Sequence, residues 1–238
     1  MGASTVTGMF DPDEKIVRQK LRPKDAATLI LVRRDAREPR ILMGRRHDSM
    51  AFHPGKYVFP GGRMDPCDQR IAAGGELQPA VMDKLVRGIA PSRARGLALA
   101  AIRETFEETG VLVGARTDNA PRTRAAAWAR FFGHGVVPEL HRLDFIGRAI
   151  TPPNRTRRFD ARFFMAEADA IACSLDHTGN DELLEACWVT FAEARALDLP
   201  TITRRMIAEA EARVDNPGAV HPVPFFYFRH GKAFMDLL

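Results

Sequence analysis

The sequence predicts an α/β sandwich built on a mixed β-sheet. Runs of β-forming residues alternate with helix-forming runs along the chain, and the clearest helix ends at a glycine. A length of 238 residues with 45% hydrophobic composition is sufficient for one substantial core. Strands flanked by helices bury both faces of a sheet, so we expect helices on both sides of it. We expect a single domain over residues 1–238, interrupted by two excursions.

The first expected elements are strands. "AATLILVRR" at 26–34 and "ILMGRR" at 41–46 are separated by the turn-rich "DAREPR", which predicts a strand pair. "KYVF" at 56–59 leads directly into "PGG" at 60–62. Two adjacent glycines after a strand allow a ligand or another chain segment to approach closely where a Cβ would block it.

The next segment is irregular, and a long helix follows it. Residues 63–97 are interrupted by several Gly and Pro, which predicts a partly helical insertion without a core of its own. We expect this insertion to lie beside the mouth of the site. Because it has no core of its own, deletion of 71–90 is expected to leave a folded protein. Ser92–Thr109 predicts a helix with an N-cap near Ser92 and a left-handed end at Gly110.

The second half of the chain continues the alternation. "AAAWARFF" at 125–132 predicts a short helix in a second excursion. "LDFIGRAITPP", "RRFDARFFMAEA" and "EACWVTFAEA" predict further strands, "AEARAL" and "PTITRRMIAEAEAR" predict late helices, and "FFYFRHGKAFMDL" predicts a β-rich tail. The apolar "PVPFFYF" of this tail suits either the core or the interface of a homodimer.

The long helix carries an acidic face. At about 100° per residue, three carboxylates project from one side, those of Glu104, Glu107 and Glu108. The opposite side is apolar and carries Leu99, Ile102 and Phe106. Ala100 and Ala101 flank the acidic face and leave room above it, and Arg103 is one helical turn before Glu107, within bonding reach.

Such a cluster has two readings. Like charges repel unless a cation neutralises them, and hard oxygen ligands suit Mg²⁺ or Mn²⁺. Alternatively, the three glutamates are a solvated surface of an ordinary helix. In the metal-site reading repulsion destabilises the cluster without metal, so Glu107→Gln is expected to be neutral or stabilising in the metal-free protein and to lower turnover with metal. The solvated reading predicts almost no effect on either quantity.

Two segments together resemble a known catalytic motif. "RETFEETGV" at 103–111 resembles the second half of the Nudix box, and "PGG" at 60–62 resembles its opening. The consensus separates its glycine from its arginine by 14 positions, whereas Gly62 and Arg103 are 41 apart, so 27 residues interrupt the motif. Asp68 stands where the consensus has its first glutamate. Flanking segments resemble the insertion-bearing branch of the Nudix superfamily that includes coenzyme A diphosphatases.

The resemblance implies a Nudix-type α/β/α sandwich and a hydrolase of nucleoside diphosphates linked to another group, with coenzyme A or acyl-CoA favoured. ADP-ribose or NADH is the alternative substrate, and a nucleotide-sensing module without catalysis is the alternative function. Family practice implies Mg²⁺ or Mn²⁺ held by Glu104, Glu107, Glu108 and the Gly62 carbonyl. The general base is either one of these glutamates or Glu182 on a later loop. Glu182 has the alternative role of a solvated loop carboxylate.

Several arginines are candidates for the substrate's phosphates. Arg157 and Arg158 suit bidentate phosphate binding, and pairing with Asp160 is the equal alternative. Arg45 and Arg46 are weaker candidates that would supply a positive field. His53 is expected to be a packing or loop residue.

Composition narrows the remaining classes. No apolar run approaches the roughly 18 residues of a membrane helix, so we expect no membrane partner. Three scattered cysteines without a CxxC pair indicate free thiols in a reducing cytoplasm. The net charge of +5 is spread along the chain rather than gathered in a basic run, which argues against nucleic acid as a partner and favours a small anionic molecule.

Overall fold

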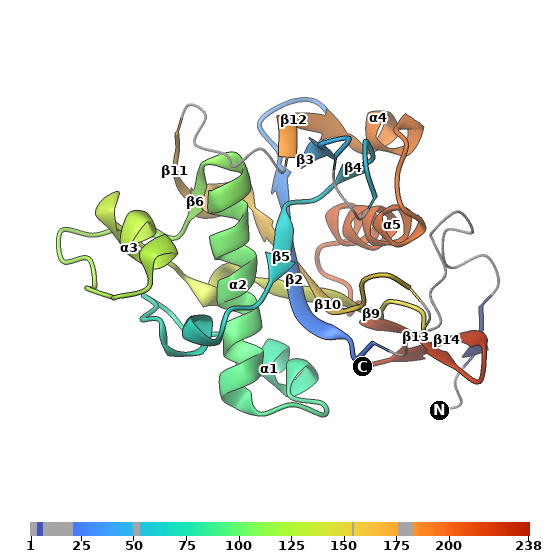
Figure 1. Cartoon of the computed structure of the whole chain (residues 1–238). Helices are drawn as coiled ribbons and strands as arrows, with labels where there is room; N and C mark the ends of the chain where they lie inside the picture. The colour runs from blue at the N-terminus through green and yellow to red at the C-terminus, as the bar shows by residue number, and fades with distance from the viewer. Residues whose placement is uncertain (1–3, 7–20, 50–52, 154, 176–182) are drawn as a thin grey trace.

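A computed structural model describes residues 4–6, 21–49, 53–153, 155–175 and 183–238 of the chain (Figure 1). The strands are β1 Ser4–Thr5, β2 Lys24–Arg33, β3 Arg40–Arg46, β4 Tyr57–Val58, β5 Gly61–Arg63, β6 Val111–Val113, β7 Ala115–Arg116, β8 Val136–Val137, β9 Asp144–Ile150, β10 Phe159–Glu167, β11 Ile171–Ser174, β12 Leu183–Thr190, β13 Pro224–Arg229 and β14 Lys232–Leu237. The α-helices are α1 Pro79–Leu85, α2 Pro91–Thr109, α3 Ala126–Gly133, α4 Phe191–Ala196 and α5 Thr201–Asp215, and the short 3-10 turns are η1 Pro66–Arg70, η2 Leu140–Arg142 and η3 Ala168–Ala170.

The main sheet is mixed, as the sequence predicts. Its order is β1-β14-β13-β9-β10-β2-β3-β12, with β4 added to β3 and β5 added to β2. β10 runs parallel to β2, and β13 runs parallel to β9, whereas the remaining pairs are antiparallel. The predicted strand pair is confirmed by the register Val32↔Ile41 between β2 and β3.

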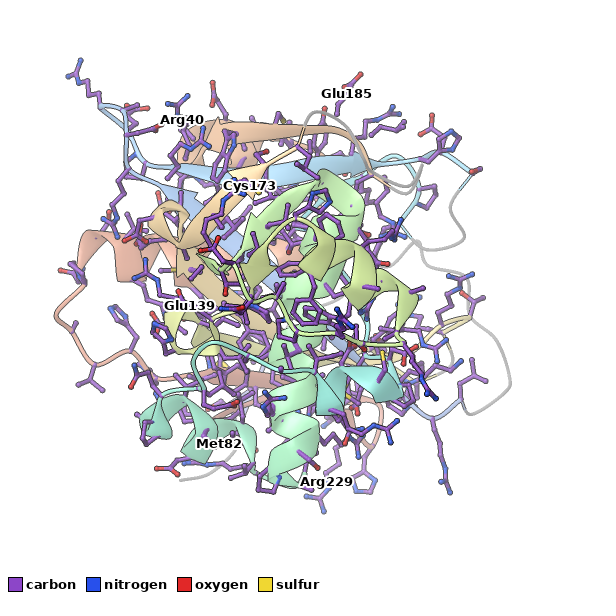
Figure 2. All side chains as sticks on the ribbon, turned by 90° about the vertical axis from the view of Figure 1, so that its left-hand side faces the viewer. Arg40, Met82, Glu139, Cys173, Glu185 and Arg229 are labelled. Atoms are coloured by element: carbon purple, nitrogen blue, oxygen red, sulfur yellow. The ribbon has the colours of Figure 1, made fainter. Side chains whose placement is uncertain are left out.

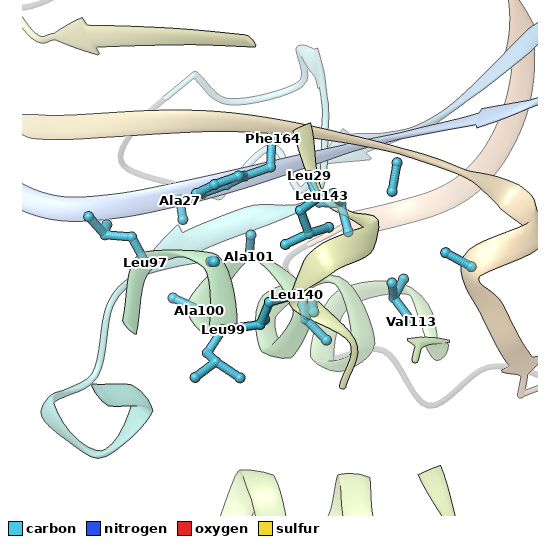
Figure 3. Close-up of a cluster of buried hydrophobic side chains, with 14 of the residues drawn as sticks. Ala27, Leu29, Leu97, Leu99, Ala100, Ala101, Val113, Leu140, Leu143 and Phe164 are labelled. Atoms are coloured by element: carbon cyan, nitrogen blue, oxygen red, sulfur yellow. The ribbon is translucent and has the colours of Figure 1, made fainter. Parts of the chain in front are cut away.

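Alternation along β2 places a core on each face of the sheet. Ala27, Leu29 and Leu31 belong to the core beneath α1, α2 and α3, whereas Ile30 and Val32 belong to the core beneath α4 and α5. Figure 1 shows α2 on one side of β2 and α5 on the other, and Figure 3 shows side chains of the first core meeting between α2 and the strands. The expected sandwich with helices on both sides is therefore present.

Helix α2 is the most buried helix of the protein. It begins at Pro91 after Ala90, so the expected N-cap at Ser92 is wrong, because proline is favoured in the first turn and sets its start. It ends as predicted at Gly110, whose φ of 71° is left-handed. Ala100 and Ala101 are fully buried between α2 and its neighbours (Figure 3), so their small size permits close packing rather than leaving open space.

The insertion packs as part of the core. Ile71, Leu77, Val81 and Leu85 are buried in the core that also contains α2. Its backbone also joins the second excursion, because the Gly74 N–H donates to Pro138 O and the Leu140 N–H donates to Gly75 O, both at 2.8 Å. Figure 2 looks onto this side of the molecule, where Met82 of α1 and Glu139 before η2 are labelled.

The C-terminal tail completes one end of the sheet. β13 and β14 form an antiparallel hairpin, and β13 also pairs with β9. Val223 and Phe226 are buried, so the tail contributes to the core as one of the two expected readings had it. Within the described residues, no helix has both the length and the apolar composition to cross a membrane.

Candidate functional site

The site is built where β5 passes the C-terminal half of α2. A Cβ on Gly61 would lie 2.5 Å from the Ala27 carbonyl oxygen of β2, and a Cβ on Gly62 would lie 2.5 Å from the Glu104 carboxylate. Real Cβ atoms do not approach this closely. The adjacent glycines therefore have separate purposes, since Gly61 lets β5 pair with β2 and Gly62 lets the Glu104 carboxylate reach the strand.

Glu108 is held by the same strand. The Gly61 N–H donates a hydrogen bond of 2.8 Å to Oε2 of Glu108. Glu108 is only 3% exposed, so the alternative reading of a solvated carboxylate is wrong at this position. Because burying a charge is costly without compensation, this glutamate is not an ordinary surface residue.

Arg103 connects the insertion, the strand and two of the glutamates. Nε and Nη2 donate to Asp68 at 3.0 Å each, and Nη2 also donates to the Arg63 carbonyl at 2.8 Å. Nη1 donates to Glu104 at 2.8 Å and to Glu107 at 2.6 Å. All five donors of a guanidinium are used in this way. The bond to Glu107 was expected from the spacing and is confirmed.

The charge of Arg103 is stabilised by these partners. Burial acts to lower the pKa of Arg103, but hydrogen bonding to Asp68 and the charge of Glu104 outweigh burial, so the pKa lies above its ordinary value. The guanidinium is therefore a permanent cation between the carboxylates of α2 and the carboxylate of Asp68.

Asp68 is the fully buried partner that sequence reasoning undervalued. Four donors surround its two oxygens, from the Asp65 N–H, Arg103 Nε, Arg103 Nη2 and the indole of Trp128. Trp128 on α3 was not singled out from the sequence at all. Its position 60 residues from Asp68 leaves no local signal, although a tryptophan beside two phenylalanines in one short helix was available as a hint.

Glu107 lies between two arginines at the outer edge of the cluster. Besides Arg103, Nη2 of Arg130 on α3 donates to Oε1 of Glu107 at 3.2 Å. The Glu107 side chain is 18% exposed, whereas that of Arg130 is 65% exposed. Mutual repulsion among the glutamates is therefore offset by cations from two elements, and not by Arg103 alone.

The donor set is suited to a hard divalent cation. Among the residues the structure describes, no trio of His, Cys, Asp or Glu side chains is arranged to hold a metal ion, because the carboxylates bond to Arg103, Arg130 and Gly61 instead. The donor types nevertheless fit Mg²⁺ or Mn²⁺, since all are oxygens, and the missing Cβ of Gly62 leaves its backbone against Glu104.

A cleft of about 390 Å³ opens beside this cluster, with Glu104 and Gly62 in its wall. Its other charged or titratable lining residues are Arg46, His53, Arg63 and Arg157. Its apolar lining includes Val58, Phe59, Ala149, Phe159, Phe163 and Ile202. His53 and Arg63 also line the cleft, although neither was a candidate substrate-binding residue. The signals that could have marked them are the strand that follows His53 and the glycine pair that precedes Arg63.

Two of the four candidate arginines line the cleft and two do not. Arg46 and Arg157 line the cleft, and the buried Nε of Arg46 has no hydrogen-bond partner in the described part of the protein. Arg45 instead bonds to Asp48 at 2.8 Å and is not among the described lining residues. Arg158 donates to the carbonyls of Thr151 and Leu21, which fixes the backbone.

Two further expectations are settled by position. The acid offered as a partner of Arg157 and Arg158 is bonded elsewhere, because Asp160 pairs with Arg148 and Arg162. Of the insertion at 63–97, Arg63 lines the cleft and no other residue is in its described lining, so the insertion borders the cleft at its first residue only. Glu182, the candidate base on a later loop, lies outside the described residues.

Comparison with known proteins gives the same family by sequence and by fold. Residues 23–210 match the NUDIX domain. The chain is 42% identical over 60 residues to a protein named "Uncharacterized Nudix hydrolase NudL" from Enterobacter sp. (strain 638), a match covering 25% of this chain and 30% of that relative's length. The fold is similar to the crystal structure of a NUDIX hydrolase from Alicyclobacillus acidocaldarius, with a TM-score of 0.63, 27% identity, and coverage of 82% of this chain and 96% of that one. With most of its length matched by the family, this chain is a member of the NUDIX domain family.

Proposed function

We propose that the protein is a divalent-metal-dependent hydrolase that cleaves the diphosphate bond of a nucleoside diphosphate linked to another group. The observation that carries the proposal is the position of Glu104. Its carboxylate is bonded to Arg103, packed on Gly62 and set in the wall of a cleft that three arginines also line. Anionic oxygens for a cation and guanidinium groups for phosphates thus meet in one space.

The proposed ligands of Mg²⁺ or Mn²⁺ are Glu104, Glu107, Glu108 and the Gly62 carbonyl. When bound, the metal would neutralise phosphate charge and polarise a phosphorus–oxygen bond. Arg103 donates to Glu104 and Glu107, and the Gly61 N–H donates to Glu108. These bonds orient the carboxylates before substrate arrives, which lowers the reorganisation that binding requires.

Arg46, Arg63 and Arg157 are proposed to bind the diphosphate. All three line the cleft, and the Nε of Arg46 has no hydrogen-bond partner in the described region. The apolar lining around Phe159, Phe163 and Ile202 suits the less polar part of the substrate, such as a base or an acyl-bearing arm. For the general base we propose a carboxylate, from the α2 cluster or from Glu182.

Coenzyme A or an acyl-CoA is the proposed substrate, with ADP-ribose or NADH as the competing class. We further propose that residues 1–238 act as one catalytic unit in the cytoplasm, with a homodimer as the assembly to test. The deciding experiment measures product formation from each candidate substrate with Mg²⁺, with Mn²⁺ and with EDTA. Metal-dependent formation of 3′,5′-ADP from coenzyme A is the expected result.

Two results would change the assignment. Cleavage of ADP-ribose or NADH more than tenfold faster than coenzyme A, about 1.4 kcal/mol in transition-state free energy, would favour the competing class. Nucleotide binding without turnover of any candidate would favour the sensing module. Size-exclusion chromatography with light scattering, with and without metal, tests the assembly.

A further inference from the structure

The Asp68 carboxylate depends on a donor from another excursion of the chain. The indole Nε1 of Trp128 donates to Oδ1 at 2.8 Å, the same oxygen that accepts from Arg103 Nε at 3.0 Å. Oδ2 accepts from Arg103 Nη2 at 3.0 Å and from the Asp65 N–H at 2.8 Å. Each oxygen therefore has two donors among the described residues, and Trp128 on α3 is the one of them that the second excursion supplies.

The indole is held rigidly in place. Trp128 is fully buried in the main core, and its ring lies 5.2 Å from that of Phe131 and 5.8 Å from that of Phe132. Phe131 in turn contacts Phe106 of α2 edge to face at 5.5 Å. These contacts fix the direction of the indole N–H, because a buried aromatic ring in a packed core has little freedom to turn.

The consequence passes through Arg103 to the acidic cluster. Asp68 receives both Nε and Nη2 of Arg103, while the remaining nitrogen, Nη1, reaches Glu104 and Glu107. A guanidinium is planar and rigid, so the orientation set by Asp68 at one edge determines where Nη1 lies at the other. Since Asp68 and Trp128 are both fully buried, water does not readily replace a lost indole donor.

We propose that Trp128 is a positioning residue for the acidic cluster, acting through Asp68 and Arg103 on Glu104 and Glu107. Trp128 is not part of the described lining of the cleft. The effect of Trp128 on metal affinity rests on the proposed function, whereas its effect on the orientation of Arg103 does not. The second excursion thereby contributes to the site without lining the cleft.

The test replaces the indole N–H and little else. Incorporation of β-(3-benzothienyl)alanine at position 128 exchanges the N–H for sulfur and keeps the ring's shape. The matched control places the same amino acid at Trp188 on β12, which is the other tryptophan of the chain. The guanidinium of Arg33 lies over the ring of Trp188. Trp128→Phe is a second variant that also removes the donor.

Two readouts separate positioning from packing. The first readout is the hydrogen-exchange rate of the Arg103 Nε–H, measured by NMR in the metal-free protein. Its signal is assigned by its loss in Arg103→Lys. We expect exchange to become about tenfold faster when the indole no longer supports the hydrogen bond between Asp68 and Arg103. The dissociation constant for Mn²⁺, measured by electron paramagnetic resonance, is expected to rise about fivefold to tenfold. The control at position 188 is expected to change neither quantity.

A double-mutant cycle completes the test. In an Asp68→Asn background the substitution at 128 is expected to add little, because the carboxylate it supports is already gone. Unchanged Arg103 exchange in the sulfur variant, or an equal effect in the Asp68→Asn background, would overturn the proposal. Absence of hydrolysis by the wild-type protein with accelerated exchange in the variant would reject the proposed function and leave the positioning of Arg103 standing.

Discussion

The backbone N–H of Gly61 and the carboxylate of Glu108 form a hydrogen bond of 2.8 Å between residues 47 positions apart. This bond joins the glycine pair before the insertion to the glutamates after it, while Ile71, Leu77, Val81 and Leu85 of the insertion are buried in the core around α2. The two halves of the motif therefore meet through β5 and α2. The intervening residues are needed to build the core around that meeting point.

Gly62→Ala is expected to abolish most activity. The added Cβ would lie 2.5 Å from the Glu104 carboxylate, so that carboxylate must move out of the cleft wall. Turnover with Mg²⁺ is expected to fall by about 10² or more, the scale of losing a positioned catalytic group. Initial rates on the best substrate measure this. Gly218→Ala, where a Cβ meets nothing within 4 Å, is the control with expected wild-type rates. Full activity in Gly62→Ala would remove Glu104 from the site.

Glu107→Gln is expected to destabilise the metal-free protein, which reverses the expectation from sequence. The carboxylate accepts from Arg103 and Arg130, so losing its charge weakens two favourable contacts rather than relieving repulsion. We expect the free energy of unfolding to fall by about 1 kcal/mol and turnover to fall roughly 10² to 10⁴. Urea titrations with EDTA and initial rates with Mg²⁺ measure the two effects.

Glu211→Gln is the matched control for that change. Glu211 pairs with Arg195 in an exposed ion pair whose residues are not in the described cleft lining, and such pairs contribute little to stability. We expect both stability and turnover to stay near wild type. A gain in metal-free stability for Glu107→Gln would show that repulsion still dominates and that the two arginine contacts are weak.

Arg157→Gln is expected to change KM, whereas Arg158→Gln is expected to change stability. Arg157 is exposed and lines the cleft, so its loss is expected to raise KM about tenfold with an unchanged melting temperature. Arg158 donates to the carbonyls of Thr151 and Leu21, so its loss is expected to lower stability by about 1–2 kcal/mol. Steady-state kinetics and melting curves distinguish the two. Equal KM changes in both variants would argue against phosphate binding by Arg157.

Deletion of residues 71–90 is expected to destroy cooperative unfolding. The segment contributes Ile71, Leu77, Val81 and Leu85 to the core, so its removal exposes the side of α2 that it covers. Leu85→Ala is the milder test and is expected to cost about 2–5 kcal/mol. Asp83→Ala, at an exposed position of the same helix, is expected to be nearly neutral. Thermal unfolding followed by circular dichroism measures all three, and a sharp wild-type transition in the deletion would restore the view of a dispensable insertion.

Local pattern predicted the elements and the chemistry of the acidic helix. The β-forming run at 26–34 and the helix ending at Gly110 depend on neighbours within a few residues, and both are confirmed. The spacing of Arg103 and Glu107 is one helical turn, so their bond followed from the sequence as well. Alternation along β3 also offered a rule for Arg45 and Arg46, because adjacent strand residues face opposite sides. Which side borders the cleft was not contained in that rule.

The sequence by itself determined the β-forming runs at 26–34 and 41–46, the long helix ending at Gly110, the expectation of helices on both sides of a mixed sheet, and the set of carboxylates on α2. Tertiary structure alone decided that Gly61 holds Glu108, that Trp128 supports Asp68, and that most of the insertion packs against α2 while only its first residue, Arg63, lines the cleft. The physical reason is range. Helical and strand periodicity arise from backbone geometry between near neighbours, whereas these contacts join segments whose approach depends on how the buried side chains of several elements pack together.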